Sequence, residues 1–148
     1  MKLSLRTFAS ALTAGACLLA GTPAAAAIIA TTSIDVPIVD LNNPCTAGHD
    51  SIDGTLNLNA IAERDPGGLI TVRFSGRGSG ADVNNLFYRF LTAGTVQFHD
   101  PLPADILLSV RLGTSTTGSN ARLGLSLHVN EQGRVTDIGQ SGLQCGGL

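Results

Sequence analysis

The stretch IDGTLNLNAIAERDPGGLITVRF, residues 52–74, decides the fold class. Apolar or small residues occupy the even positions of 52–62, and mostly polar residues occupy the odd ones, which is the two-residue period of a strand with one buried face. The segment Asp-Pro-Gly-Gly at 65–68 predicts a tight turn, because proline presets φ and glycine accepts positive φ. Apolar residues alternate again over 70–74 on the way back. The stretch therefore predicts a β-hairpin.

The same design recurs near the C-terminus, where residues 122–129 alternate before a predicted turn at 130–133 and a return strand from Val135. Shorter runs of strand character occur at 34–38, 86–91 and 106–112, and Pro37 suits an edge strand because it has no amide donor. The glycine-rich segment Gly76-Arg77-Gly78-Ser79-Gly80 is expected to be a bend or mobile loop, since it lacks the lysine and following helix of a phosphate-binding loop. Together these patterns predict an all-β fold of six to eight short strands, arranged as an antiparallel β-sandwich or a partly closed barrel.

The N-terminus has the order of a secretory signal peptide. Lys2 and Arg6 precede an apolar run from Phe8 to Ala20, and small residues follow at 23–27. We expect residues 1–27 to be a signal peptide, removed together with Cys17, and residues 28–148 to form a single secreted β domain in the extracellular space or cell envelope. No later segment is apolar for the roughly 20 residues that a membrane-spanning helix needs.

Cys45 and Cys145 are the two cysteines that remain. In an oxidising compartment, an even pair in a small exported domain predicts a disulfide, here one that joins the first and last strands. A redox or metal-binding pair is the alternative, but the chain has no C-x-x-C motif.

The charge balance is mildly acidic, with nine basic and eleven acidic residues and a formal net charge of −2. Without Lys2 and Arg6 the formal charge becomes −4. Such a domain repels nucleic acid and anionic lipid at long range, so neither is an expected partner.

Several short motifs resemble those of a group of short exported bacterial proteins of unassigned activity. They are Asn43-Pro44-Cys45, the glycine-rich segment 76–80, Leu127-His128-Val129-Asn130 and Gly133-Arg134-Val135-Thr136, followed by a cysteine close to the end. The resemblance implies a compact β domain. It implies no catalytic residue, because none is assigned in that group.

Catalytic or metal-binding chemistry has one weak candidate, the cluster of His49, Asp50 and Asp53. An imidazole and two carboxylates could bind a metal or form a base with its orienting acid. The simpler interpretation is a polar loop, in which such residues serve turn chemistry alone. His99 similarly suits a turn, and His128 a solvent-facing sheet position. No G-x-S-x-G motif is present, and no cofactor is predicted.

A possible binding surface would form if Arg73, Arg89 and Arg111 lay on neighbouring strands in equal register. Such a stripe would bind carboxylate or phosphate groups in bidentate fashion. The alternative is a solvated face on which the arginines pair with acidic residues across strands.

Three functions from different classes remain open. The first is a non-enzymatic extracellular binding or surface-interaction module, whose partner would be an extracellular protein or a small ligand. The second is a carrier that holds a small apolar ligand in a barrel cavity. The third is a small hydrolase centred on His49, Asp50 and Asp53. The lack of a recognisable catalytic constellation in the sequence favours the first function, the binding module.

Overall fold

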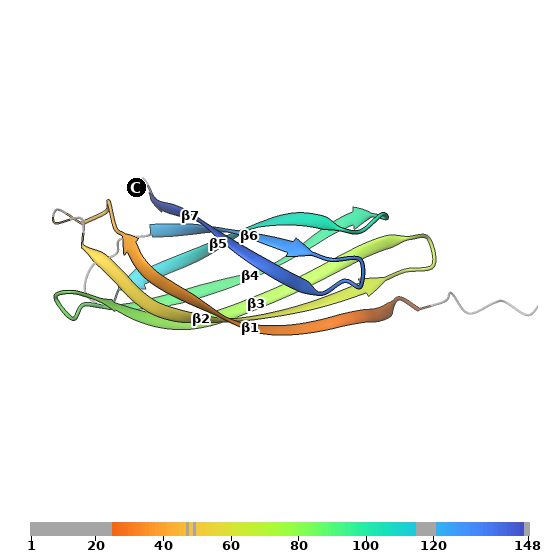
Figure 1. The fold of residues 1–148 in the computed structure, drawn as a ribbon, viewed down its shortest axis with the longest axis horizontal. Coiled ribbons are helices and arrows are strands. Elements are labelled where there is room, and N and C mark those ends of the chain that lie inside the picture. The colour runs from red at the N-terminus through yellow and green to blue at the C-terminus, as the bar shows by residue number, and fades with distance from the viewer. Residues whose placement is uncertain (1–24, 47, 49, 115–120, 147–148) are drawn as a thin grey trace, which may run out of the picture.

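The computed structural model describes residues 25–46, 48, 50–114 and 121–146, and these form one antiparallel sheet without helices (Figure 1). Each strand pairs with the next in the chain. The strands are β1 (Ala27–Asn42), β2 (Ser51–Arg64), β3 (Leu69–Asp82), β4 (Phe87–His99), β5 (Ala104–Thr114), β6 (Ala121–Val129) and β7 (Val135–Cys145). The all-β prediction is confirmed.

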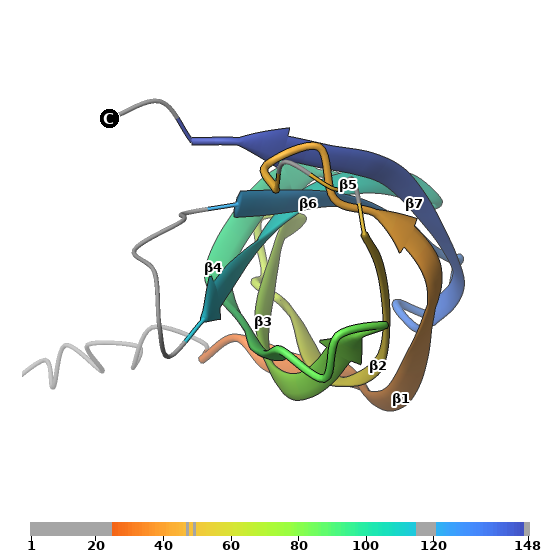
Figure 2. The same cartoon turned by 90° about the vertical axis from the view of Figure 1, so that its left-hand side faces the viewer.

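The sheet curls until β7 lies beside β1, which gives a nearly closed barrel rather than a sandwich (Figure 2). Alternate residues of the strands point inward and form one continuous buried cluster that includes Leu56, Phe90 and Leu125. On β2 the buried positions are the even ones, as the two-residue period predicts. The core therefore fills the barrel, and the polar half of the pattern forms its outer surface.

Both predicted hairpins are present. In the first, the Asp65 carboxylate accepts a hydrogen bond from Leu69 N (2.8 Å), and Gly68 adopts a φ of 82°. In the second, the Asn130 side chain accepts hydrogen bonds from Gln132 N and Arg134 N at 3.0 and 2.9 Å. In each turn a side-chain oxygen serves as the acceptor for backbone N–H groups, in place of a backbone carbonyl. These hydrogen bonds fix the register of the strands that follow.

The glycine-rich segment 76–80 is not the expected bend or loop but the second half of β3. Its glycines occupy inward positions at which a side chain has no room. A Cβ atom at Gly78 would collide with the carbonyl oxygen of Thr55, and one at Gly80 would lie 2.8 Å from the ring of Phe90. The strand pattern thus continues through these residues with glycine in place of an apolar side chain.

The seam between β1 and β7 is closed without a backbone ladder between the two strands in the described chain. Val135 N donates to the Thr32 hydroxyl (3.3 Å), and the Gln140 amide donates to the Pro37 carbonyl (2.7 Å). At the end of the seam, Cys45 and Cys145 form the predicted disulfide, with their Cα atoms 5.4 Å apart. The barrel is therefore closed mainly by side chains and one covalent bond.

The predicted signal peptide falls almost entirely on residues 1–24, which lie outside the described residues, and β1 begins at Ala27. Among the described residues, no helix has the length and apolar character required to cross a bilayer.

Removal of the disulfide should destabilise the barrel. For a closed loop of this length (sequence separation 100), we expect a Cys45→Ser/Cys145→Ser variant to lose roughly 2–4 kcal/mol of unfolding free energy. Denaturant unfolding with and without reductant measures this loss. Reductant should weaken the wild type and leave the variant unchanged; equal midpoints for all samples would contradict a role of the bond in stability.

The inward glycines provide a second test. Gly78→Ala should destabilise the protein by about 1–3 kcal/mol, because the new methyl group would collide with the backbone of β2. Gly113→Ala is the matched control, since a Cβ there meets no atom within 4 Å, and its stability should change by less than about 0.5 kcal/mol. Chemical denaturation of both variants checks the contrast, and equal stabilities would refute the close approach.

Candidate anion-binding groove

Three arginines lie in one row across the outer face of the barrel. Arg77 on β3 pairs with Leu91 on β4, Leu91 pairs with Arg111 on β5, and Arg111 pairs with Arg122 on β6. All four residues are exposed and point away from the core. Neighbouring strands are about 4.8 Å apart, so the three guanidinium groups start from backbone positions that span roughly 14 Å.

The row lies in a groove of ≈ 720 Å³ on this face. The groove is lined in equal measure by polar and apolar surface, and the described residues that line it include no carboxylate. They are Asn57, Asn59, Ser75, Gly76, Arg77, Leu91, Thr92, Ala93, Ser109, Arg111 and Arg122. This set of donors suits an anionic ligand.

The groove arginines have no partner within the described chain. Arg73, by contrast, binds Glu63 through two contacts of 3.2 and 2.9 Å, and Arg64 binds Asp100 at 3.0 Å. Arg111 and Arg122 face each other directly, and like charges in that position destabilise a sheet. An anion bound between them would relieve this repulsion.

The predicted stripe of Arg73, Arg89 and Arg111 lies on consecutive strands, but its members do not share a register. Arg73 is opposite Thr95, while Arg89 is opposite Ser79 and Gly113. Of the three, only Arg111 lines the groove. The predicted stripe left out Arg77 and Arg122. The alternation places both on outward faces, but only the register of the strands shows that they align with Arg111.

Strands β4 and β5 part at this groove. Their ladder consists of four pairs, from Tyr88 with Thr114 to Leu91 with Arg111. Beyond it, the Thr92 hydroxyl donates to the Ser109 carbonyl (3.0 Å), where a backbone donor would normally stand. We call this place the fork. The groove lining includes residues from both of its arms.

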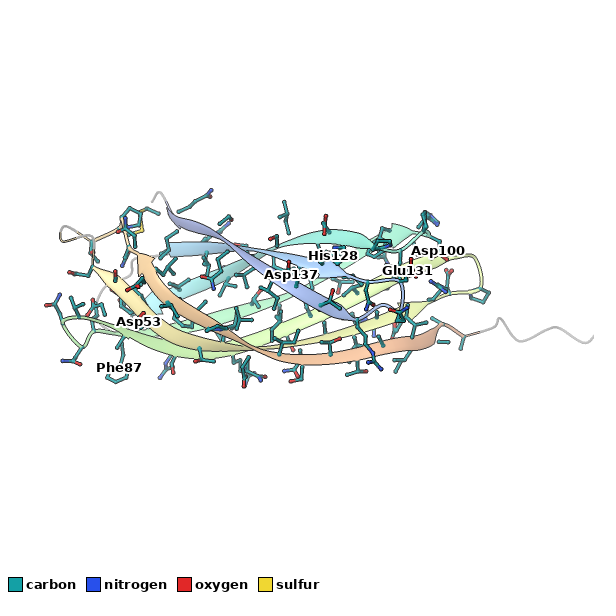
Figure 3. All side chains as sticks on the ribbon, in the orientation of Figure 1. Asp53, Phe87, Asp100, His128, Glu131 and Asp137 are labelled. Atoms are coloured by element: carbon teal, nitrogen blue, oxygen red, sulfur yellow. A yellow bond between two sulfur atoms is a disulfide. The ribbon has the colours of Figure 1, made fainter. Side chains whose placement is uncertain are left out.

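A smaller hollow of ≈ 300 Å³ lies on the outer face of β5, β6 and β7. The His128 Nδ1 atom is 2.8 Å from the Asp105 carboxylate, and Asp137 faces His128 from β7 (Figure 3). Both members of the His128–Asp105 pair are substantially exposed, at 42% and 79%. Such exposed pairs contribute little energy, so this arrangement is that of an ordinary sheet surface, as expected for His128.

The cluster proposed as a weak metal or hydrolase site can be followed only in part. His49 lies outside the described residues. Asp53 points outward from β2 and accepts a hydrogen bond from Asp40 N (2.8 Å), while Asp50 N donates to the Thr46 hydroxyl (3.4 Å). Asp50 and Asp53 thus make local contacts that fix the connection between β1 and β2.

A buried polar cluster of Asn43, Asp82 and Tyr88 supports the end of the barrel that carries the disulfide. The Asn43 amide donates to the Tyr88 hydroxyl, and that hydroxyl donates to the Asp82 carboxylate, both at 3.2 Å. Asp82 also accepts from Asn84 N and Leu86 N, at 2.9 and 3.0 Å. Burial raises the pKa of Tyr88, and the hydrogen bond to Asp82 and the charge of that carboxylate raise it further, while the hydrogen bond from Asn43 lowers it. The side chains of the cluster are hydrogen-bonded to one another and to nearby backbone N–H groups, as expected of buried polar residues with a structural role.

Tyr88 gives this cluster a measurable signature. Because its pKa is raised in the folded state, its contribution to stability is complete below about pH 10 and is lost as the pH rises further. Tyr88→Phe should cost about 1–3 kcal/mol at pH 7, since it leaves buried polar partners unpaired, and should flatten the decline above pH 10. Denaturation between pH 7 and 11 tests this clearly, as Tyr88 is the only tyrosine and the described residues contain no lysine. Parallel curves for the two proteins would contradict it.

Comparison of the chain with protein-family models, with curated proteins and with solved structures finds no match. We therefore infer the function from the groove itself.

Proposed function

We propose that this protein is an exported, non-enzymatic binding module whose groove recognises the anionic groups of an extracellular ligand. The observation that carries the proposal is the row of Arg77, Arg111 and Arg122, which are exposed and have no partner in the described chain. Guanidinium groups bind carboxylates and phosphates through two parallel hydrogen bonds, which gives both affinity and orientation.

The environment of the row supports binding rather than simple solvation. Arg64 and Arg73 bind acidic neighbours on the same protein. Arg89 and Arg134 are exposed and have no partner in the described chain, but each stands alone. The groove differs because three such arginines share one register there.

The groove also adds the hydroxyls of Ser75 and Ser109, which would complete the hydrogen bonding of a ligand. The Asn57 amide is already engaged, since it donates to Asp35 (2.8 Å) and accepts from Asn59 (3.0 Å). A cationic groove on a domain of net negative charge selects ligands at short range, because only an anion that reaches the arginines gains their attraction.

Export is proposed from the N-terminal sequence and is compatible with the disulfide, a bond that persists in oxidising compartments. A carrier of apolar ligands is less favoured because the inward side chains already form one continuous core. A hydrolase is less favoured because the groove presents guanidinium, amide and hydroxyl groups, none of them paired with a base in the contacts described.

The proposal is tested with tripolyphosphate and citrate as small multivalent anions, titrated into the mature protein by calorimetry at low salt. We expect saturable binding that Arg111→Gln weakens about tenfold, the loss of a charge-assisted interaction worth roughly 1.4 kcal/mol. Arg77→Gln and Arg122→Gln should each weaken binding, and added salt should reduce it.

Arg134→Gln is the matched control. It removes the same charge from an exposed arginine in the turn between β6 and β7, away from the groove. Its affinity should stay within about twofold of the wild type. If all four variants weaken binding equally, the anions sense only the total charge and the proposed groove is wrong; absence of any binding would also refute it.

A further inference from the structure

The fork between β4 and β5 adds a second recognition element to the groove. Resting on the proposed function, we propose that the natural ligand is an extended acidic peptide segment that adds as a strand to the free edge of β5 at the fork. Its carboxylate would reach the groove arginines, and its backbone would pair with that edge.

The edge of β5 that faces β4 has no ladder partner before Arg111 in the described chain. The Ser109 carbonyl accepts the Thr92 hydroxyl, which places the backbone polar groups of Ser109 on the β4 side. In an antiparallel strand alternate residues face the same side, so Leu107 presents its backbone there as well. An exposed row of this kind is a template for strand addition.

The wall of the barrel is also less well covered near the fork. Phe74, Val96 and Phe98 point inward from β3 and β4 but are only partly buried against the core. The inward side chains of β5 are better covered by contrast, since Ile106 and Leu108 are at most 5% exposed. A strand added at the fork would cover apolar surface that the protein leaves incompletely buried.

The outer face of β5 sets the pattern that the ligand should carry. Leu107, Ser109 and Arg111 point outward at two-residue spacing, and Leu107 is 81% exposed. Leu91, 50% exposed, extends this apolar surface beside Arg111. On that edge Arg111 is already paired with Leu91 of β4. A paired peptide would therefore place an apolar residue opposite Leu107 and an acidic residue opposite Ser109, two positions apart on one face, from where the carboxylate reaches Arg111 on the diagonal.

The ligand carboxylate would then lie beside the arginine row, next to Arg111. Arg122 is the direct neighbour of Arg111, and Arg77 is two strand spacings away, about 10 Å at the backbone. The side chains of Arg77 and Arg111, extended toward each other, would span this distance and reach one carboxylate. The fork thus offers main-chain pairing, apolar contact and charge to one extended segment.

The experiment uses a terminally blocked ten-residue peptide of alternating Thr and Val, with Leu and Glu two positions apart on one face. A second peptide has Leu and Glu three positions apart, which puts them on opposite faces. A third is the first peptide with two amides of one edge N-methylated, and a fourth is methylated on the other edge. Affinities for the mature protein are measured by calorimetry, and tripolyphosphate is titrated in parallel.

We expect the first peptide to bind and the change of spacing to weaken it about tenfold. Methylation of one edge should weaken binding by a similar factor while methylation of the other has little effect, because only one edge of the peptide pairs with β5. Leu107→Thr should weaken the first peptide but leave tripolyphosphate binding unchanged. Peptide addition should also slow amide exchange at Leu107 and Ser109.

Equal binding of all four peptides would mean that charge alone acts, and the strand addition would be refuted while the anion-binding function stands. Binding of tripolyphosphate without binding of any peptide would likewise refute the strand addition and leave the anion-binding function standing. If neither the peptides nor tripolyphosphate bind, both the inference and the proposed function fail. Leu107→Thr is an exposed substitution to a residue favoured in strands, so a loss of binding does not reflect misfolding.

Discussion

The close approach of backbones between β2 and β3 is the constraint on which the barrel depends. At Gly54, Gly78 and Gly80, a Cβ atom would meet main-chain atoms of the paired strand. Side chains there would push the two strands apart or force them to straighten, and a sheet that cannot bend sharply does not return to its own first strand. The glycines therefore give up core volume, and Phe90 fills the space above Gly54 and Gly80.

The same constraint reaches the outer surface. Arg77 stands between Gly76 and Gly78, two residues whose inward sides are in contact with neighbouring atoms. The backbone at Arg77 is thereby fixed, although its side chain has no partner among the described residues. A binding group mounted on a rigid strand loses less entropy on capture of a ligand than one on a loop. The shape of the core and the position of the proposed binding face are thus consequences of one packing arrangement.

The sequence predicted the parts of this fold that depend on neighbours in the chain. The hairpin of residues 52–74 was recognisable because alternation and turn residues lie within one short window. The disulfide was predictable because only Cys45 and Cys145 remain after the N-terminal segment. Residues 76–80 were wrongly predicted as a bend or loop because a glycine-rich composition is typical of turns. Only the contact with β2 shows that glycine is required at these positions inside a strand.

The arginine row could not be found in the same way. Arg77 and Arg122 are 45 positions apart, and they meet Arg111 only through the register of three successive strand pairs. An error of one residue in any pair turns a side chain to the other face. The fork is even less visible in the sequence, since alternation continues through β4 and β5 although their ladder stops.

One last consequence follows from the exposure of β7. Of its residues only Val135 is buried, and the strand is held chiefly by β6, by a few side-chain contacts to β1 and by the sulfur bond at its end. A strand that has a backbone ladder along one edge only, and whose side chains are mostly exposed, is mechanically compliant. Deformation of the barrel, whether thermal or imposed by a surface on which the protein rests, would concentrate along β7. The arginine face on β3 to β6 would keep its shape.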